Sequence, residues 1–270
     1  MPNGTRAFVA NTVSGTITVL AINRNSPRPA RFVTDIRVGT EPYSLVLTPN
    51  GKKLYVANAR SNDISVIETS TSRVVKTIDN IGIEPRGMAI TNNGDTNDAD
   101  ETLLVTQFLA LPVATGKIDG EDDSKVGLVT MISTATDSVL RTVTIRPMAH
   151  TGFKAAGDAI AKVAAPATPT TDDLKFTTGA YPNQLNNVAI RGNFAYLPAT
   201  GASPNGPVRF DVNTHSLLAA IDLTTNLDAN RTINMHPFVR DQTSVPKLFN
   251  TQPWAMAAKH KADEGYVAIA

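Results

Sequence analysis

GKKLYVANARSNDISVIE, residues 51–68, reads as a tight turn followed by two short strands. A closely similar sequence, GTRAFVANTVSGTITVLA, lies 47 positions upstream at residues 4–21. Short runs rich in apolar residues lie on both sides of a short Asn- or Gly-containing turn, which is typical of a β-hairpin. A hairpin sequence that recurs at a fixed spacing indicates a repeat architecture.

Three more copies follow, each less regular than the first two. The third is TLLVTQF from Thr102, which rejoins the pattern at KVGLVTMIST from Lys125. The fourth is NFAYLPATGASPNGPVRFDV from Asn193, and the fifth begins with GYVAIA at residues 265–270.

Each hairpin is followed by two further predicted strands. The first is a β-branched run, which reads ARFVTDIRV, SRVVKTIDN, DSVLRTVTI and HSLLAAIDL in successive copies. The second is a strand of small apolar residues, which reads EPYSLVL, EPRGMAI, LNNVAI and QPWAMAA. The unit is therefore four short strands in 43 to 47 residues. That length is typical of a β-propeller blade, at about 40–50 residues.

The sequence thus predicts an all-β fold, a β-propeller of four-stranded antiparallel blades. A β-sandwich is the alternative, but its strands do not normally follow a four-strand repeat. We expect residues 1–270 to form a single propeller domain with about four repeats, as part of a larger ring of about seven blades. A small propeller closed by the C-terminal strand is the other reading. In a larger ring the remaining blades would come from another segment or another chain.

Composition excludes several classes of protein. Hydrophobic residues make up 41%, enough for a packed core, and 25 basic residues balance 24 acidic ones without a basic stripe. Nucleic acid is therefore not an expected partner. The absence of cysteine excludes disulfides, thiolate catalysis and a covalently attached c-type haem. No apolar run reaches the roughly 18 residues of a membrane span, and the first residues do not read as a signal peptide.

The motifs resemble those of a known repeat family. YVAN at residues 55–58, FVAN at 8–11 and YVAIA at 266–270 are similar to the repeat of YVTN-family β-propellers, as is the text from Pro42 to Ile78. The resemblance implies an exported protein, either periplasmic or at the cell surface, from a family in which few members have a defined enzymatic activity.

Three long insertions interrupt the later repeats, at residues 108–125, 146–181 and 224–251. Strands alternate in direction within a blade, so we expect all three on one face, around the mouth of the central channel. Long loops in compact domains are usually functional, although loop drift without function is the alternative. The Ala-rich residues 153–165 predict a short helix in the second insertion.

The inner strands carry the first candidate site. Alignment of these strands places Tyr43, Arg86, Asn186 and Trp254 at one equivalent position, facing the inserted loops. Varied large and polar side chains at a repeated position are what a ligand-binding surface would show. The alternative is that packing between blades tolerates variety there.

Two insertions each pair a histidine with a methionine, at Met148 with His150 and at Met235 with His236. Both histidines are candidate ligand-binding residues. Imidazole with thioether suits copper or haem iron, although surface histidines are the plainer interpretation. His215 and His260 are expected to be structural or solvated, with His215 in the turn between a third strand and an outer strand.

Two acidic loops are candidate calcium sites, because oxygen-rich side chains at close spacing suit that ion. One contains Asp119, Asp122 and Asp123, and the other contains Asp95, Asn97 and Asp100. Neither has the spacing of an EF-hand, and solvated acidic loops are the alternative.

No Ser–His–Asp frame, phosphate loop or dinucleotide motif is present, so no catalytic residues are predicted. We therefore expect a non-catalytic binding or scaffold module whose partner is a protein, a surface polymer or a small ligand. The alternative is the propeller portion of a metal- or haem-dependent redox enzyme.

Overall fold

The computed structural model describes residues 2–95, 97–113, 116–117, 119–152, 154–155, 176–204, 213–237, 252–258 and 265–269. It divides into two compact units, one of residues 1–107 with 129–142 and one of residues 108–128 with 143–270. The division passes within two strands of the third blade. The described part of the chain contains no helix long and apolar enough to cross a membrane.

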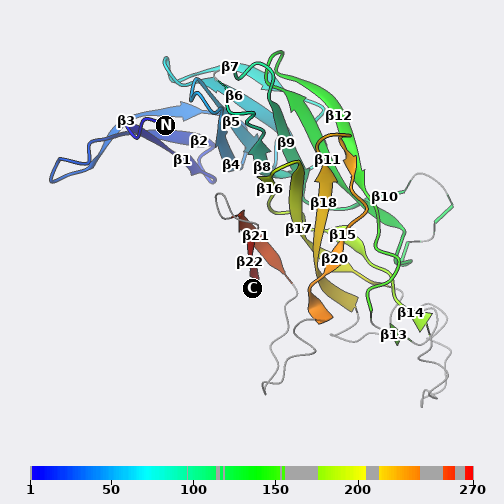
Figure 1. Cartoon of the computed structure of the whole chain (residues 1–270). Helices are drawn as coiled ribbons and strands as arrows, with labels where there is room; N and C mark the ends of the chain where they lie inside the picture. The colour runs from blue at the N-terminus through cyan, green and yellow to red at the C-terminus, as the bar shows by residue number, and fades with distance from the viewer. Residues whose placement is uncertain are drawn as a thin grey trace. The chain divides into compact units, whose positions relative to one another are not determined.

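The first two blades lie in the first unit (Figure 1). The first has three antiparallel strands in sequential order: β1 (Arg6–Asn11), β2 (Thr16–Ile22) and β3 (Ala30–Arg37). The second has four, from the inner to the outer strand: β4 (Pro42–Leu47), β5 (Lys53–Asn58), β6 (Asp63–Glu68) and β7 (Arg73–Ile78). These strands agree with the prediction from the repeat.

The third blade keeps the same order with one addition. Its strands are β8 (Pro85–Ile90), β9 (Thr102–Gln107), β11 (Lys125–Ser133) and β12 (Ser138–Ile145). The insertion at 108–125 contributes β10 (Leu111–Pro112), which pairs with the first residues of β11.

The fourth blade has six strands because both of its edges are split. The inner edge consists of β15 (Tyr181–Asn183) and β16 (Ala189–Arg191), which both pair with β17 (Phe194–Ala202). Next comes β18 (Thr214–Asp222), and the outer edge consists of β19 (Leu227–Asp228) and β20 (Ile233–Asn234). The fifth copy is a pair of strands, β21 (Pro253–Ala258) and β22 (Gly265–Ile269).

Strand register confirms the repeat. The inner strand pairs with the second strand at the same motif position in four copies: Val46 with Tyr55, Ala89 with Leu104, Ala189 with Tyr196, and Ala257 with Tyr266. A one-residue slip would exchange the two faces of a strand. The shared register therefore shows that the four-strand unit predicted from the sequence is the structural unit.

One strand assignment was wrong. HSLLAAIDL was predicted as the outer strand of the fourth repeat, but β18 lies beside β17 in the third position. The outer strands β3, β7 and β12 are mostly exposed, whereas β18 is mostly buried. The outer strand of this blade comes instead from residues 227–234, inside the range predicted as the third insertion. The predicted third strand, PVRFDV, lies outside the described residues.

The predicted helix at 153–165 falls mainly outside the described residues. Where the segment is described, residues 154 and 155 form a short strand, β13 (Lys154–Ala155), which pairs with β14 (Phe176–Thr177). At these two residues the helix prediction was therefore wrong.

The core of the first unit lies between adjacent blades. Alternate residues of β5 point to opposite faces of the second blade, as the period of a strand requires. Leu54 and Val56 pack with residues of the first blade such as Ile17, whereas Tyr55 and Ala57 pack with residues of the third blade such as Leu103. Burial on both faces explains why β5 is an almost continuous apolar run, and it is the packing expected of propeller blades.

Candidate functional site

The start of the inner strand carries a backbone irregularity in three copies. The pairing of β4 with β5 skips Tyr43, and the pairing of β21 with β22 skips Trp254. In β8 the corresponding shift spans Arg86 and Gly87. Such β-bulges redirect a side chain away from the regular alternation and are frequent beside functional sites. Tyr43, Arg86 and Trp254 are called the bulge residues below.

Two bulge residues are in contact in the first unit. The guanidinium carbon of Arg86 lies 4.6 Å from the centroid of the Tyr43 ring. This cation–π contact fixes both side chains, because the positive charge is attracted to the face of the ring. Tyr43 remains 40% exposed, so an aromatic surface is available to a ligand beside a held cation.

Paired charges extend this surface. Glu84 lies 4.0 Å from Arg86, and Arg60 lies 3.5 Å from Glu84 and 3.6 Å from Glu41. Glu41 and Glu84 each precede the proline that begins an inner strand, and both have a positive φ, of 57° and 48°. The chain therefore turns into the strand at a carboxylate in both blades, which places alternating charges beside the aromatic ring.

The loop that precedes the inner strand packs closely on the end of the second strand of the same blade, in both the second and the third blade. Gly82 has a φ of +100°, and a Cβ there would lie within 2.1 Å of the Gln107 amide nitrogen. The Gln107 side-chain oxygen accepts a hydrogen bond of 3.1 Å from the Ile83 N–H. Gly39 approaches Asn58, the last residue of YVAN, in the same way. The motif asparagine and its glutamine counterpart thus support the loops that lead to the bulges.

The second unit contains the other two predicted residues of this set. Trp254 is 45% exposed on β21, and Asn186 lies in the break between β15 and β16 with 8% exposure. Within the described part of the chain, the Asn186 side-chain oxygen accepts no hydrogen bond. A buried acceptor without a donor costs about 1–3 kcal/mol, so a bound donor at this position would be favoured.

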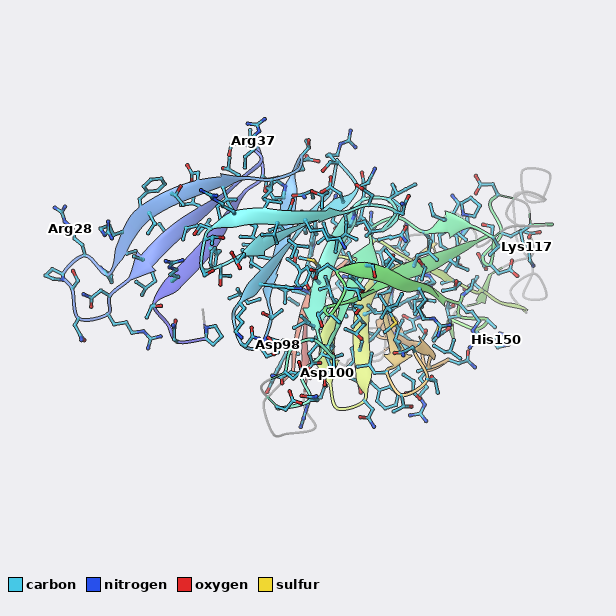
Figure 2. All side chains as sticks on the ribbon, turned by 90° about the horizontal axis from the view of Figure 1, so that it is seen from above. Arg28, Arg37, Asp98, Asp100, Lys117 and His150 are labelled. Carbon is cyan, nitrogen blue, oxygen red and sulfur yellow. The ribbon has the colours of Figure 1, made fainter. Side chains whose placement is uncertain are left out.

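The two loop histidines have different environments. His150 is exposed (Figure 2), whereas His236 is buried with its ring centroid 5.5 Å from that of His215 in an edge-to-face arrangement. The Asn234 amide nitrogen donates to the Thr151 carbonyl at 2.8 Å and lies 3.2 Å from Nδ1 of His215. His215 is therefore structural, as one of the two predictions stated, but its predicted position in a turn was wrong because it lies within β18. His260 lies outside the described residues.

The two candidate methionines make backbone hydrogen bonds. Met148 pairs with Ala180, and the Met235 N–H donates to the Ser216 carbonyl at 2.8 Å. In the described ranges, no group of three or more His, Asp or Glu side chains converges where a metal ion would bind. Copper or haem iron at these residues stays a prediction.

The first acidic loop is tied into the second unit by Asp122. Its carboxylate accepts hydrogen bonds from the Gly179 N–H at 2.8 Å and from the Ser203 hydroxyl at 3.3 Å. Asp119 pairs with Lys125 at 3.2 Å, and Asp123 pairs with Lys117 at 2.5 Å. The three carboxylates therefore have separate polar partners.

The second acidic loop is a series of side-chain-to-backbone turns. Asp95 accepts from the Asn97 N–H at 2.7 Å, and Asn97 accepts from the Ala99 N–H at 3.1 Å. Asp100 accepts from the side chain of Asn93 at 3.1 Å, close to Asp98 in the same turn (Figure 2). These bonds shape the loop, and calcium at either loop stays a prediction.

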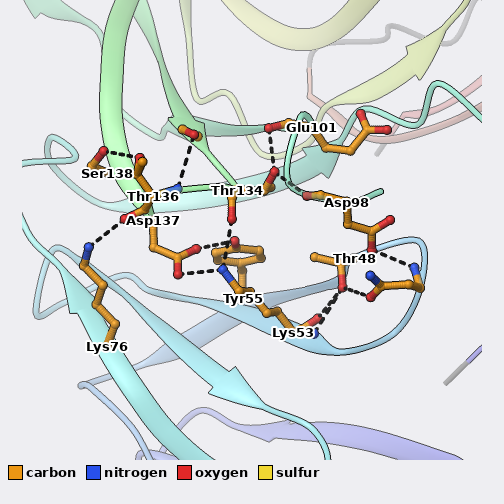
Figure 3. Close-up of polar contacts among 12 residues, drawn as sticks. Thr48, Lys53, Tyr55, Lys76, Asp98, Glu101, Thr134, Thr136, Asp137 and Ser138 are labelled. Atoms are coloured by element: carbon orange, nitrogen blue, oxygen red, sulfur yellow. Dashed lines mark hydrogen bonds and ion pairs between the residues drawn. The ribbon is translucent and has the colours of Figure 1, made fainter. Parts of the chain in front are cut away.

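A polar clasp joins the second and third blades at the other end of their strands (Figure 3). Lys53 donates to the Thr134 carbonyl at 2.9 Å and pairs with Asp137 at 2.7 Å. The Tyr55 hydroxyl donates to the other Asp137 oxygen at 2.6 Å. Burial, and then the bond to Asp137, raise the pKa of Tyr55 far above its usual range. The tyrosine of YVAN thus links two blades.

Comparison with known proteins supports the fold. No protein-family profile and no curated protein matches the sequence. Among solved structures, the chain is similar to a hydrazine synthase of Kuenenia stuttgartiensis, with a TM-score of 0.65 and 18% identity. The match covers 99% of this chain and 59% of that chain, so this chain spans less than two thirds of its length. Together with the four-stranded antiparallel sheets, the likeness shows that the fold is of the β-propeller type.

Sequence reasoning missed several residues of the site. Glu84 pairs with Arg86, and Arg60 links Glu84 to Glu41, but only the repeated Glu-Pro pair before the inner strand signalled any of the three. The contact of His236 with the buried His215 was also not predicted. A signal for the burial of His215 was present, because this residue begins an apolar run without charges. The structure joins Tyr43 to Arg86 in one unit and holds Asn186 and Trp254 in the other.

Proposed function

We propose that this chain is a non-catalytic β-propeller binding module that holds ligands on the bulge residues of each unit and on the loops beside them. The observation that carries the proposal is the recurrence of the bulge at the start of the inner strand. It exposes Tyr43 and Trp254 and holds Arg86 against the Tyr43 ring. Aromatic and arginine side chains contribute most to recognition surfaces.

The chemistry of the surface favours a ligand with flat apolar faces and hydrogen-bonding edges. The Tyr43 ring offers a face, while Arg60, Glu41 and Glu84 offer donors and acceptors beside it. A surface polymer or an extended peptide combines these two properties. We also propose that the chain belongs to the YVTN-type repeat proteins and acts outside the cytoplasm, which rests on the YVAN motifs and their shared register.

Arrays of defined glycans and defined peptides test the proposal. We expect the purified chain to retain one or more array ligands, whose affinity is then measured by calorimetry. Tyr43→Ala and Arg86→Ala are expected to weaken binding by about tenfold or more, because each removes a principal contact. Trp254→Ala is expected to do the same for a ligand held by the second unit.

The matched control is Phe32→Ala, which removes an aromatic ring that is 57% exposed on the outer strand β3. It should leave the affinity unchanged. Retention of the same array ligands, with equal affinity, by all three bulge variants would refute the proposed surface.

A second candidate is the propeller portion of a metal- or haem-dependent redox enzyme. Its support is limited to the similar structure, which is named a synthase and is longer than this chain. Metal analysis of the purified chain tests this candidate. Stoichiometric copper or iron that disappears in a His236→Ala variant would favour it over the binding module.

A further inference from the structure

A pocket lined by two aromatic rings lies on one face of the fourth blade. The rings are those of Phe194 and Tyr196 in β17, with centroids 6.2 Å apart and planes tilted by 44°. The remaining lining residues, from β18 and the outer edge of the blade, are Leu218, Ala220, Arg231 and Ile233. The pocket measures about 190 Å³ and belongs entirely to the second unit.

The second blade shows what the equivalent positions bind. Tyr55 has the same register position as Tyr196. Lys53 stands two residues before Tyr55, so it corresponds to Phe194 and faces the same side of its strand. The Tyr55 hydroxyl and the Lys53 ammonium bind the two oxygens of the Asp137 carboxylate, at 2.6 and 2.7 Å. A tyrosine hydroxyl and a cation at this place therefore already hold a carboxylate once in this chain.

The fourth blade keeps the tyrosine but takes its cation from another element. Phe194 stands in place of the lysine, and Arg231, between β19 and β20, lies over the Phe194 ring with its guanidinium carbon 5.6 Å from the centroid. This cation–π contact holds the guanidinium at the pocket. Among the described residues, no carboxylate bonds to the Tyr196 hydroxyl or to the Arg231 guanidinium. Both groups are therefore available to a carboxylate from outside.

One carboxylate lies near the pocket but does not line it. Asp222 pairs with Phe194 across the sheet and accepts bonds from the Thr224 N–H and hydroxyl, at 2.8 and 2.6 Å. These bonds lower the pKa of Asp222, and the charge of Arg231 adds a smaller effect in the same direction. Asp222 thus weakens the positive field of Arg231 without forming an ion pair with it in the described part of the chain.

We propose that this pocket binds a small molecule in which a single aromatic ring carries a carboxylate group. The carboxylate accepts bonds from Arg231 and Tyr196, as Asp137 does from its two partners in the second blade. Hydrogen bonds between ions of this kind are stronger than neutral ones. The ring packs on Phe194 and Ile233, beside the apolar side chains of β18. The volume lies below the range for drug-sized ligands, about 300–1,000 Å³, and so suits one ring.

Ligand-observed NMR titration of the purified chain tests the site with four probes: phenylacetate, benzoate, phenylacetamide and acetate. We expect at least one of the two aromatic acids to bind, more weakly at high salt. Phenylacetamide has the ring without the charge, and acetate has the charge without the ring, so each should bind at least tenfold more weakly. If neither aromatic acid binds at low salt, or if phenylacetamide binds as well as phenylacetate, the proposal is overturned.

Two substitutions sharpen the test. Arg231→Glu should weaken the binding of phenylacetate more than tenfold and favour benzylamine, which carries a positive charge on the same ring. Tyr196→Phe should weaken the binding of phenylacetate by about tenfold, as expected for a bond to a charged group. Arg28→Gln is the control, because it removes a positive charge from the loop between β2 and β3 (Figure 2). Wild-type affinity in both Arg231→Glu and Tyr196→Phe, with folded circular dichroism spectra, would contradict the site.

Sedimentation of the purified chain distinguishes a small ligand from a second copy of the chain. A monomer that binds an aromatic acid supports the proposal. A dimer that dissociates on Arg231→Glu would assign the pocket to an interface between copies and would overturn the small-molecule assignment. No bulge residue lines the pocket, so the glycan and peptide arrays test the proposed binding surface independently.

Discussion

The second and fourth blades share a strand register but differ at their edges. In the second blade the inner and outer strands, β4 and β7, are each continuous. In the fourth blade both edges are broken into short pieces, and a buried group of His215, Asn234 and His236 lies beside the outer edge. The second and third strands are continuous and mostly buried in both blades. The middle of the blade thus maintains the fold, while the edges are free to change and carry the candidate sites.

The largest effect on the free energy of unfolding is expected from a substitution in β18. Leu217 in β18 is fully buried, whereas Val75 in the outer strand of the second blade is 57% exposed. Leu217→Asp should lower the free energy of unfolding by more than about 4 kcal/mol, because it buries an unpaired charge. Val75→Asp should cost less than about 1 kcal/mol. Urea unfolding measures both, and equal tolerance would mean that β18 is an outer strand after all.

Substitutions of the motif tyrosines are expected to have an intermediate effect on stability. Tyr55 and Tyr196 occupy the same register position, but the Tyr55 hydroxyl donates to Asp137, whereas the Tyr196 hydroxyl has no hydrogen-bond partner among the described residues. Tyr55→Phe should therefore cost about 2 kcal/mol, as for a bond to a charged group. Tyr196→Phe should cost less than about 0.5 kcal/mol. If thermal unfolding shows equal losses of stability, the hydrogen bond from Tyr55 to Asp137 does not stabilise the fold.

The hydroxyl of Tyr55 should also affect stability at alkaline pH. The pKa of Tyr55 is raised in the folded chain. Its contribution to stability is complete below the pKa of an unfolded tyrosine, about 10, and is lost as the pH rises above it. The free energy of unfolding should fall more steeply with pH above about 10 in the unaltered chain than in Tyr55→Phe. Identical slopes would show that Tyr55 ionises freely in the folded state.

The surface charges at the bulge give the smallest expected effect on stability. Arg60 is exposed and pairs with Glu41 and Glu84 at 3.6 and 3.5 Å. Exposed ion pairs contribute about 0–1 kcal/mol, so Arg60→Ala should hardly change the unfolding midpoint. A larger loss would assign these charges to the fold instead of to a ligand surface.

The regular blades could be predicted because their signals are local. Short apolar runs, Asn- or Gly-containing turns and the repeated Glu-Pro pair fix the strands of the second blade within a few residues. The same local reasoning failed at β18, since an apolar run suits either a third or an outer strand. Two signals distinguish them in retrospect. The outer strands contain charged residues such as Arg31, Lys76 and Arg141, whereas charge in β18 is confined to its last residue, Asp222.

The second signal is the turn that follows the third strand. Its last residue has a positive φ in three blades, at Ser72, Asp137 and Asn226. Each stands four positions after the last residue of a third strand, Asn226 after Asp222 of β18. The turn therefore marks β18 as a third strand, although a single copy read alone does not reveal this.

The sites were only partly predictable, for a physical reason. Alignment of the inner strands correctly placed Tyr43 and Arg86 at one repeated position. The contact between them, and their link to Arg60 through Glu84, depend on how one blade packs on the next. The partner of Tyr55 lies 82 residues away in the sequence. No local pattern predicts such a contact, because it arises only when two separate repeats are stacked.

Ligand retention by a chain without its bulge side chains tests the central claim most directly. The triple variant Tyr43→Ala, Arg86→Ala, Trp254→Ala and the unaltered chain would be applied to the same arrays of defined glycans and peptides. The account predicts that the unaltered chain retains at least one array ligand and that the triple variant, with an unchanged circular dichroism spectrum, loses it. Equal retention by both chains would contradict the assignment of the binding surface to the bulge residues.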